Sequence, residues 1–385
     1  IYRHVWVESA AAVSVGHWGT YIVPVLKGNG TAQFKVVASI ENTTGKAVKA
    51  IVRNTLLDAE GRRVASSQSA MKLAAKGDNT QTLSLRKPRL WSVEHPYIYT
   101  MRTEVVVDGS VVDTYDTTTG VRTFKFDSKK GFSLNGKSMK INGVCQHHDL
   151  GCLGAALSED ALHRQLTMLR DMGCNAVRCS HNPPSPELLN MCDTMGIIVM
   201  DESFDMWRKK KTQNDYARFF DEWHERDLTD LIVRDRNHPS ILMWSIGNEV
   251  LEQWNQADAD TLTLEQANRI LNFGHDMTEQ AKESGMNINS LLTKRLADIV
   301  RSLDPTRPIT AGCNEPEPSN NLFRSKALDI IGFNYHRQWI KDVPKNFPDM
   351  PFLMTESVSA LQTRGHYTMP SDSLIAAPLS WDKEY

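Results

Sequence analysis

Short apolar runs alternate with helical segments between residues 140 and 356, and this alternation limits the fold more than any other feature. Runs such as 197–200 and 241–246 consist almost entirely of apolar residues. Such runs predict parallel strands that are buried on both faces, and amphipathic segments such as Pro186–Met195 predict the helices between them. Strands that alternate with helices form a parallel α/β architecture. Seven strands can be counted, so we predict a (β/α)8 TIM barrel whose last strand is missing from this sequence.

Two of the predicted strands end directly in a glutamate. The run 241–246 leads into Gly247, Asn248 and Glu249, and the run 350–355 leads into Glu356. Because the carboxyl ends of barrel strands share one mouth, we expect the two glutamates to meet there. Glycoside cleavage needs such a pair, one carboxyl group as acid/base and the other as nucleophile or base. A single glutamate at a strand end is more often a solvated loop residue, so the prediction rests on the pair and on Asn248.

The first third of the chain has a different pattern. Residues 16–125 contain about seven short segments of β character, separated by turns such as Gly28–Gly30 and Asn42–Gly45. This pattern predicts an immunoglobulin-like β-sandwich, although the Cys…Trp…Cys pattern of antibody domains is absent. We interpret it as a spacer domain without chemistry. From residue 126 onward the alternating pattern of the barrel takes over.

Composition excludes several classes of protein. Hydrophobic residues make up 41% and charged residues 23% of the chain, which is typical of soluble globular proteins. The net charge of -2 gives no reason to expect nucleic acid or an acidic membrane as a partner, and no apolar run is long enough for a transmembrane helix. We interpret the short basic run Arg208–Lys211 as a solvated loop. The six cysteines have neither Cys-x-x-Cys nor zinc spacing, so we predict free thiols and no metal site.

Several segments resemble glycoside hydrolase family 2, the family of β-galactosidases, β-glucuronidases and β-mannosidases. The resemblance covers essentially the whole chain and is carried by 141–149, Asn175–Pro183, Asn237–Glu249 and Pro351–Glu356 in the barrel and by Leu90–Tyr99 in the sandwich. The segment Ile1–Val7 resembles the last strand of the jelly-roll domain that precedes the sandwich in this family. The resemblance therefore implies a jelly-roll remnant at 1–15, the sandwich at 16–125, and a barrel domain at 126–385 that is incomplete at its C-terminus.

The resemblance also implies a role for individual residues. It implies a retaining exo-β-glycosidase that works by double displacement, with Glu249 as acid/base and Glu356 as nucleophile. Asn248 would bind the 2-hydroxyl of the sugar, and Arg178 and Tyr335 would hold the nucleophile. The remaining candidates for substrate binding are His147, His181, Asp201 and Trp339, and Trp207 and Trp244 are further candidates for stacking on a sugar face.

Departures from the family pattern bear on the substrate. The Asn-x-Lys triplet that marks glucuronidases is absent after Glu356. We therefore place β-D-galactosides first and keep β-glucuronides, for which Arg364 could supply a cation, and β-mannosides as alternatives. The segment Asp201–Trp207 lacks the histidine that helps to bind magnesium in the metal-dependent β-galactosidases, so no cofactor is expected.

An alternative from another class is a non-catalytic carbohydrate-binding protein. The presence of Glu249, Glu356 and Asn248 argues against it, because a binding module needs neither an acid nor a nucleophile. A carbohydrate is the expected partner, and the family suggests a homo-oligomer. The compartment stays open, with a periplasmic or secreted location favoured over the cytoplasm.

Overall fold

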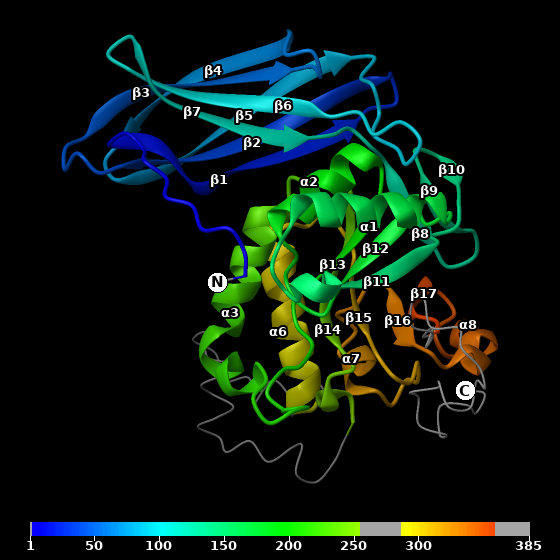
Figure 1. Ribbon diagram of the computed structural model, residues 1–385. Helices are drawn as coiled ribbons and strands as arrows, with labels where there is room; N and C mark the ends of the chain where they lie inside the picture. The colour runs from blue at the N-terminus through cyan, green and yellow to red at the C-terminus, as the bar shows by residue number, and fades with distance from the viewer. Residues whose placement is uncertain (1, 255–285, 359–385) are drawn as a thin grey trace.

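The computed structural model describes residues 2–254 and 286–358. A β-sandwich built from the first third of the chain lies across one end of a barrel built from the rest (Figure 1). The sandwich and the barrel predicted from the sequence are therefore both confirmed. The C-terminal end of the predicted barrel domain and Arg364 lie outside the described residues, and the absence of an eighth strand stays a prediction.

The sandwich consists of two antiparallel sheets. One has the order β1-β2-β5 and the other the order β4-β3-β6-β7. The strands are β1 (Val13–Leu26), β2 (Thr31–Asn42), β3 (Val48–Leu57), β4 (Arg63–Leu73), β5 (Lys76–Arg86), β6 (Tyr99–Val107) and β7 (Ser110–Thr119). Inward side chains alternate with polar ones, and Phe34, Val36, Leu56 and Met101 are fully buried between the sheets. Strand β4 was not singled out in the sequence because polar residues such as Ser66, Ser67 and Gln68 run through it.

Seven parallel strands of the barrel are described, as predicted. They are β11 (Gly143–His147), β12 (Ala176–Ser180), β13 (Ile198–Glu202), β14 (Ile241–Asn248), β15 (Ile309–Gly312), β16 (Ile331–Asn334) and β17 (Phe352–Glu356). The first five form one sheet and the last two a parallel pair, and a bridge between Cys313 and Phe333 connects the two groups. The helices are α1 (Glu159–Asp171), α2 (Pro186–Met195), α3 (Ala217–Asp235), α6 (Ile288–Leu303), α7 (Asn321–Arg324) and α8 (Val343–Asn346).

Successive side chains of a barrel strand face opposite sides, and this alternation decides which residues can reach the mouth. On β13, Val199 packs outward in the large core between strands and helices, whereas Met200 packs inward against Met243 and Ile330. Residues two positions further along β13 therefore face the same sides, Asp201 outward and Glu202 inward.

The sandwich covers the amino ends of the barrel strands. Asn237, just before β14, accepts a hydrogen bond from the Ile22 amide at 2.9 Å and donates to the Thr20 carbonyl at 2.9 Å. The indole nitrogen of Trp91 donates to the Asp193 carbonyl at 2.8 Å. A small sheet of β8 (Phe124–Asp127), β9 (Gly131–Leu134) and β10 (Lys137–Ser138) connects the two domains. The carboxyl ends of the strands are consequently left for the site.

The hairpin predicted at Asn135 and Gly136 is confirmed between β9 and β10. Both residues have positive φ, 51° and 78°, which is the backbone of a tight hairpin turn. At the N-terminus, the Tyr2 carbonyl accepts a hydrogen bond from Leu157, and Arg3 donates to the carbonyls of Pro183 and Pro184. The jelly-roll origin of this segment stays a prediction. Among the helices of the described ranges, none combines the length and the apolar character that a membrane span needs.

Candidate active site

The two strand-end glutamates are joined by one amide. Asn334, the last residue of β16, donates from Nδ2 to Glu249 Oε1 at 3.0 Å and to Glu356 Oε1 at 3.0 Å. These two oxygens can therefore be no further apart than twice 3.0 Å. Carboxyl groups lie about 5–5.5 Å apart in retaining glycosidases and roughly 6.5–9.5 Å apart in inverting ones. An upper limit of this size on the nearest oxygens is compatible with the shorter, retaining spacing.

Arg178 links Glu356 to a second, buried carboxylate. Its Nη1 donates to Glu356 Oε1 at 2.7 Å, and its Nε and Nη2 donate to Glu202 Oε2 at 3.0 and 2.7 Å. Burial alone would raise the pKa of Glu202, but the charge of Arg178 and the contacts with His181 and Ser245 outweigh it and lower that pKa. Glu202 is therefore ionised, and it fixes the Arg178 guanidinium against the proposed nucleophile.

The side-chain amide of Asn248 has one defined orientation. Its Oδ1 accepts from Arg178 Nη2 at 2.8 Å and from Asn334 Nδ2 at 3.1 Å, so the two N–H groups of Asn334 are shared among Asn248, Glu249 and Glu356. Its Nδ2 donates to Asp205 Oδ1 at 2.9 Å. One N–H of the amide remains to donate to a substrate.

Tyr335 and the two histidines surround Glu356. The Tyr335 hydroxyl donates to Glu356 Oε2. His181 lies with Nδ1 2.7 Å from Glu202 Oε1 and Nε2 3.6 Å from Glu356 Oε1. The His147 ring packs edge-on against His181 with centroids 5.1 Å apart, and burial together with the charge of His181 lowers the pKa of His147. His147 is therefore a neutral imidazole that can both donate to and accept from a hydroxyl.

The structure corrects the prediction for Asp201. Asp201 faces outward from β13 and is completely buried, with Asp235 and Arg234 of α3 as charged neighbours. Burial, followed by the charge of Asp235, raises the pKa of Asp201 well above its ordinary value. The prediction placed a carboxylate at the end of the third strand, but strand alternation makes Glu202 the residue that faces the mouth.

Sequence reasoning also missed Asn334 and Glu202. Asn334 directly precedes Tyr335 at the end of the sixth strand, so its position at a strand end was the signal that could have identified it. Glu202 followed Asp201 in the same run, and only the phase of the strand separates the two.

The basic run Arg208–Lys211 is not a solvated loop throughout. The Lys211 side chain is 19% exposed, and its ammonium donates to Asp205 Oδ1 at 2.7 Å and to the Asn248 carbonyl at 2.8 Å. Arg208 is 9% exposed and donates to Asn289 Oδ1 at 2.6 Å. Both ends of the run are therefore anchored in the barrel, and Lys211 reaches the residue next to Glu249.

The three tryptophans fall into two groups. Trp207 and Trp244 are fully buried and donate from Nε1 to the Ile246 carbonyl and to Asp304 Oδ2, so neither can stack on a sugar. Trp339 is half-buried and lies parallel to His336 with ring centroids 5.0 Å apart. Trp339 follows Tyr335 closely in the chain, and its contact with a sugar stays a prediction.

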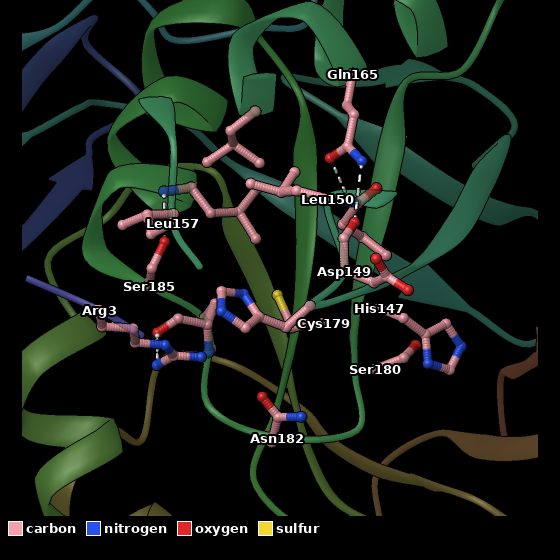
Figure 2. Close-up of a pocket in the computed structure, with 15 residues that line it drawn as sticks. Arg3, His147, Asp149, Leu150, Leu157, Gln165, Cys179, Ser180, Asn182 and Ser185 are labelled. Atoms are coloured by element: carbon pink, nitrogen blue, oxygen red, sulfur yellow. Dashed lines mark hydrogen bonds between the residues drawn. The ribbon is translucent and has the colours of Figure 1, made fainter. Parts of the chain in front are cut away.

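Two cavities border these residues and differ greatly in size. Figure 2 shows the smaller one, lined by Arg3, His147, Ser180 and Asn182 among others, with a volume of about 30 Å³. A cavity of this volume can hold water but no sugar ring. A larger cavity of about 470 Å³ is bordered by His181 and Asp205 and extends past Tyr216 to Trp18 of the sandwich.

One group of side chains in the described ranges could hold a metal ion. It consists of His4, Glu159 and Glu187, whose ligand atoms lie within 4.8 Å of one another. His4 and Glu159 are exposed, and His4 already pairs with Glu187 at 2.7 Å. The group comes from the N-terminal segment, α1 and α2, and no strand end contributes to it.

Comparisons with known proteins agree with this geometry. The family model "Glycosyl hydrolases family 2, TIM barrel domain" matches residues 127–375, and "Glycosyl hydrolases family 2" matches residues 18–122. The chain is 55% identical over 387 residues to "Beta-galactosidase BoGH2A" of Bacteroides ovatus, a match that covers 100% of this chain and 46% of the relative. It is 29% identical to a "Beta-glucuronidase" of Paenibacillus borealis, over 76% of this chain and 43% of the relative.

A solved structure gives the same result for the fold. The crystal structure of a glycosyl hydrolase family 2 member from Bacteroides cellulosilyticus superposes with a TM-score of 0.78 at 34% identity, over 90% of this chain and 41% of the other. The chain thus spans less than half the length of the relatives described here.

Proposed function

Since this chain belongs to glycosyl hydrolase family 2, we propose that it carries the active site of a retaining exo-β-glycosidase that acts on terminal β-D-galactosides. The observation that supports this most directly is the shared Asn334 amide, which brings one oxygen of Glu249 and one oxygen of Glu356 to the same donor, as close carboxyl groups of a retaining pair require. The same spacing argues against the non-catalytic binding protein, for which the pair would have no use.

In the first step Glu356 attacks the anomeric carbon while Glu249 gives its proton to the leaving oxygen. The bond between the sugar and the leaving group breaks, and a covalent sugar–Glu356 ester forms. Arg178 and Tyr335, each bonded to one oxygen of Glu356, orient the carboxylate for this attack. In the second step Glu249 takes a proton from water, and the water oxygen displaces Glu356 with a second inversion, so the β configuration is retained.

Residues around the pair supply the contacts to the sugar. The remaining N–H of Asn248 is assigned to the 2-hydroxyl, and this bond strengthens in the transition state. His147 and His181 are assigned to other hydroxyls because their rings lie beside Glu356. No metal takes part in this proposal.

The preference for a neutral sugar has an electrostatic basis. A uronic acid carries a carboxylate that calls for a cation with free donors. Within the described residues, the two basic side chains bonded into the site are Arg178, which holds Glu202 and Glu356, and Lys211, which holds Asp205. Both cations are already paired with acids, so a galactoside fits better than a glucuronide, and the 55% identical relative is named a β-galactosidase.

The test is hydrolysis of a panel of nitrophenyl β-glycosides by the full-length protein. We expect turnover of the β-D-galactoside and much slower turnover of the β-D-glucuronide and β-D-mannoside. Preferential turnover of the glucuronide would contradict the galactoside as the proposed substrate but not the proposed mechanism. A folded protein that is inactive on the whole panel would contradict the proposed glycosidase activity. Assembly into a homo-oligomer is a further part of the proposal, on the ground of the family alone, and light scattering tests it.

A further inference from the structure

Asp205 and Lys211 form a closed triangle of contacts with Asn248. Both lie in the segment between β13 and α3, and neither was among the predicted site residues. Lys211 Nζ contacts Asp205 Oδ1 at 2.7 Å and the Asn248 carbonyl at 2.8 Å, and Asp205 Oδ1 accepts from Asn248 Nδ2 at 2.9 Å. With side chains 33% and 19% exposed, Asp205 and Lys211 are better shielded from water than an ordinary surface ion pair.

The triangle holds Asn248 at two different points. Lys211 fixes its backbone carbonyl, at the last residue of β14, and Asp205 fixes the nitrogen end of its side-chain amide. On the oxygen end, Arg178 and Asn334 are donors. A reversed amide would bring its NH2 group against these two donors and its oxygen against the Asp205 carboxylate, so the network permits one orientation.

We propose that Asp205 and Lys211 are positioning residues for recognition of the sugar 2-hydroxyl, which act by holding the Asn248 amide so that its remaining N–H meets that hydroxyl. This inference rests on the proposed function, in which Asn248 binds the 2-hydroxyl. Lys211 has a second effect in the same arrangement, because its charge balances Asp205 close to the two catalytic carboxylates. Neither residue needs to touch the sugar.

The segment that carries Lys211 is itself anchored, and this supplies a control. Asp215 accepts from the backbone amides of Lys211 at 2.6 Å, Thr212 at 2.8 Å and Ala217 at 3.0 Å. Asp215→Asn loosens the same segment but removes no contact with Asn248. A purely structural role of the segment would make all variants in it behave alike.

The experiment compares the galactoside with its 2-deoxy analogue. The wild type, Asp205→Asn, Lys211→Met, Lys211→Arg and Asp215→Asn are assayed on both nitrophenyl substrates in the full-length protein, with kcat and KM determined separately. For Asp205→Asn and Lys211→Met we expect kcat on the galactoside to fall roughly 10- to 100-fold, as for the loss of a hydrogen bond to a charged group. On the 2-deoxy substrate the same variants should lose less than about threefold, because the hydroxyl that Asn248 would bind is absent.

The controls separate positioning from folding. Lys211→Arg keeps a cation and should recover most of the kcat that Lys211→Met loses. Asp215→Asn should lower kcat on both substrates by the same factor. Equal losses on the two substrates for Asp205→Asn and Lys211→Met would overturn the proposal. If the wild type hydrolyses the galactoside and both variants keep its kcat, the positioning role is also overturned, while the proposed function stands. A wild type inactive on every glycoside removes the proposed function and this inference with it.

Discussion

The mouth and the closed end of the barrel each contain a buried arginine beside carboxylates, Arg178 at the mouth and Arg307 at the closed end. At the closed end, Arg307 donates to Asp304, whose oxygens also accept from Tyr21, Thr306 and Trp244. Burial alone would raise the pKa of Asp304, but Arg307 and Thr306 outweigh it and hold that pKa below its ordinary range. The sandwich residue Tyr21 completes this cluster, so it belongs to the contact between the domains.

The mouth differs in how its carboxylates are satisfied. Within the described ranges, Glu249 receives a side-chain hydrogen bond from Asn334 alone, and the same amide also serves Glu356. Glu249 is only partly buried, whereas Asp304 is 0% exposed. The comparison teaches that buried charge does not by itself mark a catalytic site. Glu249, which has a single side-chain donor among the described residues and is partly exposed, can exchange a proton with a substrate, whereas the enclosed Asp304 stabilises the contact between the domains.

Removal of the two mouth carboxylates should have the largest effect on activity. We expect Glu356→Gln to lower kcat by about 10⁴-fold or more, and Glu249→Gln by roughly 10²- to 10⁴-fold on substrates with poor leaving groups. Glu249→Gln removes no ion pair from the part of the chain that the structure describes, and in Glu356→Gln the Arg178 guanidinium stays paired with Glu202, so both urea midpoints should stay near that of the wild type. Glu317→Gln, an exposed glutamate, serves as the control for kcat and for urea unfolding. A Glu356→Gln variant with substantial galactosidase activity would contradict the assignment.

At the closed end of the barrel, we expect a substitution to have a large effect on stability and a small effect on activity. Arg307→Met leaves Asp304 buried without its cation and should destabilise the protein by about 3–5 kcal/mol, with little change in kcat per folded molecule. Arg226→Met, which removes an exposed pair with Asp230 at 3.7 Å, should cost less than about 1 kcal/mol. Urea unfolding together with active-site titration measures both quantities. Equal urea midpoints for the two variants would show that the buried pair of Arg307 with Asp304 contributes no more to stability than an exposed ion pair.

Loss of the Asn334 side-chain amide should lower kcat by an intermediate amount. Asn334→Ala removes the donor that bridges Glu249 and Glu356 and should lower kcat roughly 100-fold, in the range found for the loss of one preorganised donor at a reaction centre. Asn346→Ala, at an exposed asparagine after β16, is the matched control and should keep full activity. Steady-state kinetics on the galactoside distinguishes the two. Wild-type kcat in Asn334→Ala would mean that the bridge contributes nothing to catalysis.

Asp201 should give the smallest effect and one that depends on pH. Because burial raises its pKa in the folded state, the folded protein binds one more proton than the unfolded chain once the pH exceeds about 4. Stability therefore falls as pH rises through this window, and Asp201→Asn should remove that loss. We expect the variant to be more stable than the wild type at pH 7, with a difference that shrinks toward pH 4.

Activity provides the second measurement for Asp201. Since Asp201 faces α3 and not the mouth, kcat/KM of Asp201→Asn should stay within about threefold of the wild type. A large rise in KM for the galactoside would instead indicate that Asp201 contacts the sugar, as predicted from the sequence. Urea unfolding at several pH values and one kinetic series are sufficient.

These residues also show how far the sequence could predict the site. Apolar runs located the strands, and Glu249 and Glu356 could be found because each ends such a run. Strand phase could not be determined from a run that is apolar on both faces, so Asp201 was chosen where Glu202 faces the mouth. Lys211 lies in a segment without periodicity, and its position depends on contacts with Asp205 and Asn248 that only the folded chain brings together.

The stereochemistry of hydrolysis distinguishes attack by Glu356 from attack by water, because it depends on the spacing of Glu249 and Glu356. The full-length protein is mixed with nitrophenyl β-D-galactoside, and the first anomer of free galactose is identified by proton NMR before mutarotation. We expect the β-anomer to appear first, as for carboxyl groups about 5–5.5 Å apart. Initial formation of the α-anomer would show inversion and would contradict a mechanism in which Glu356 attacks the sugar.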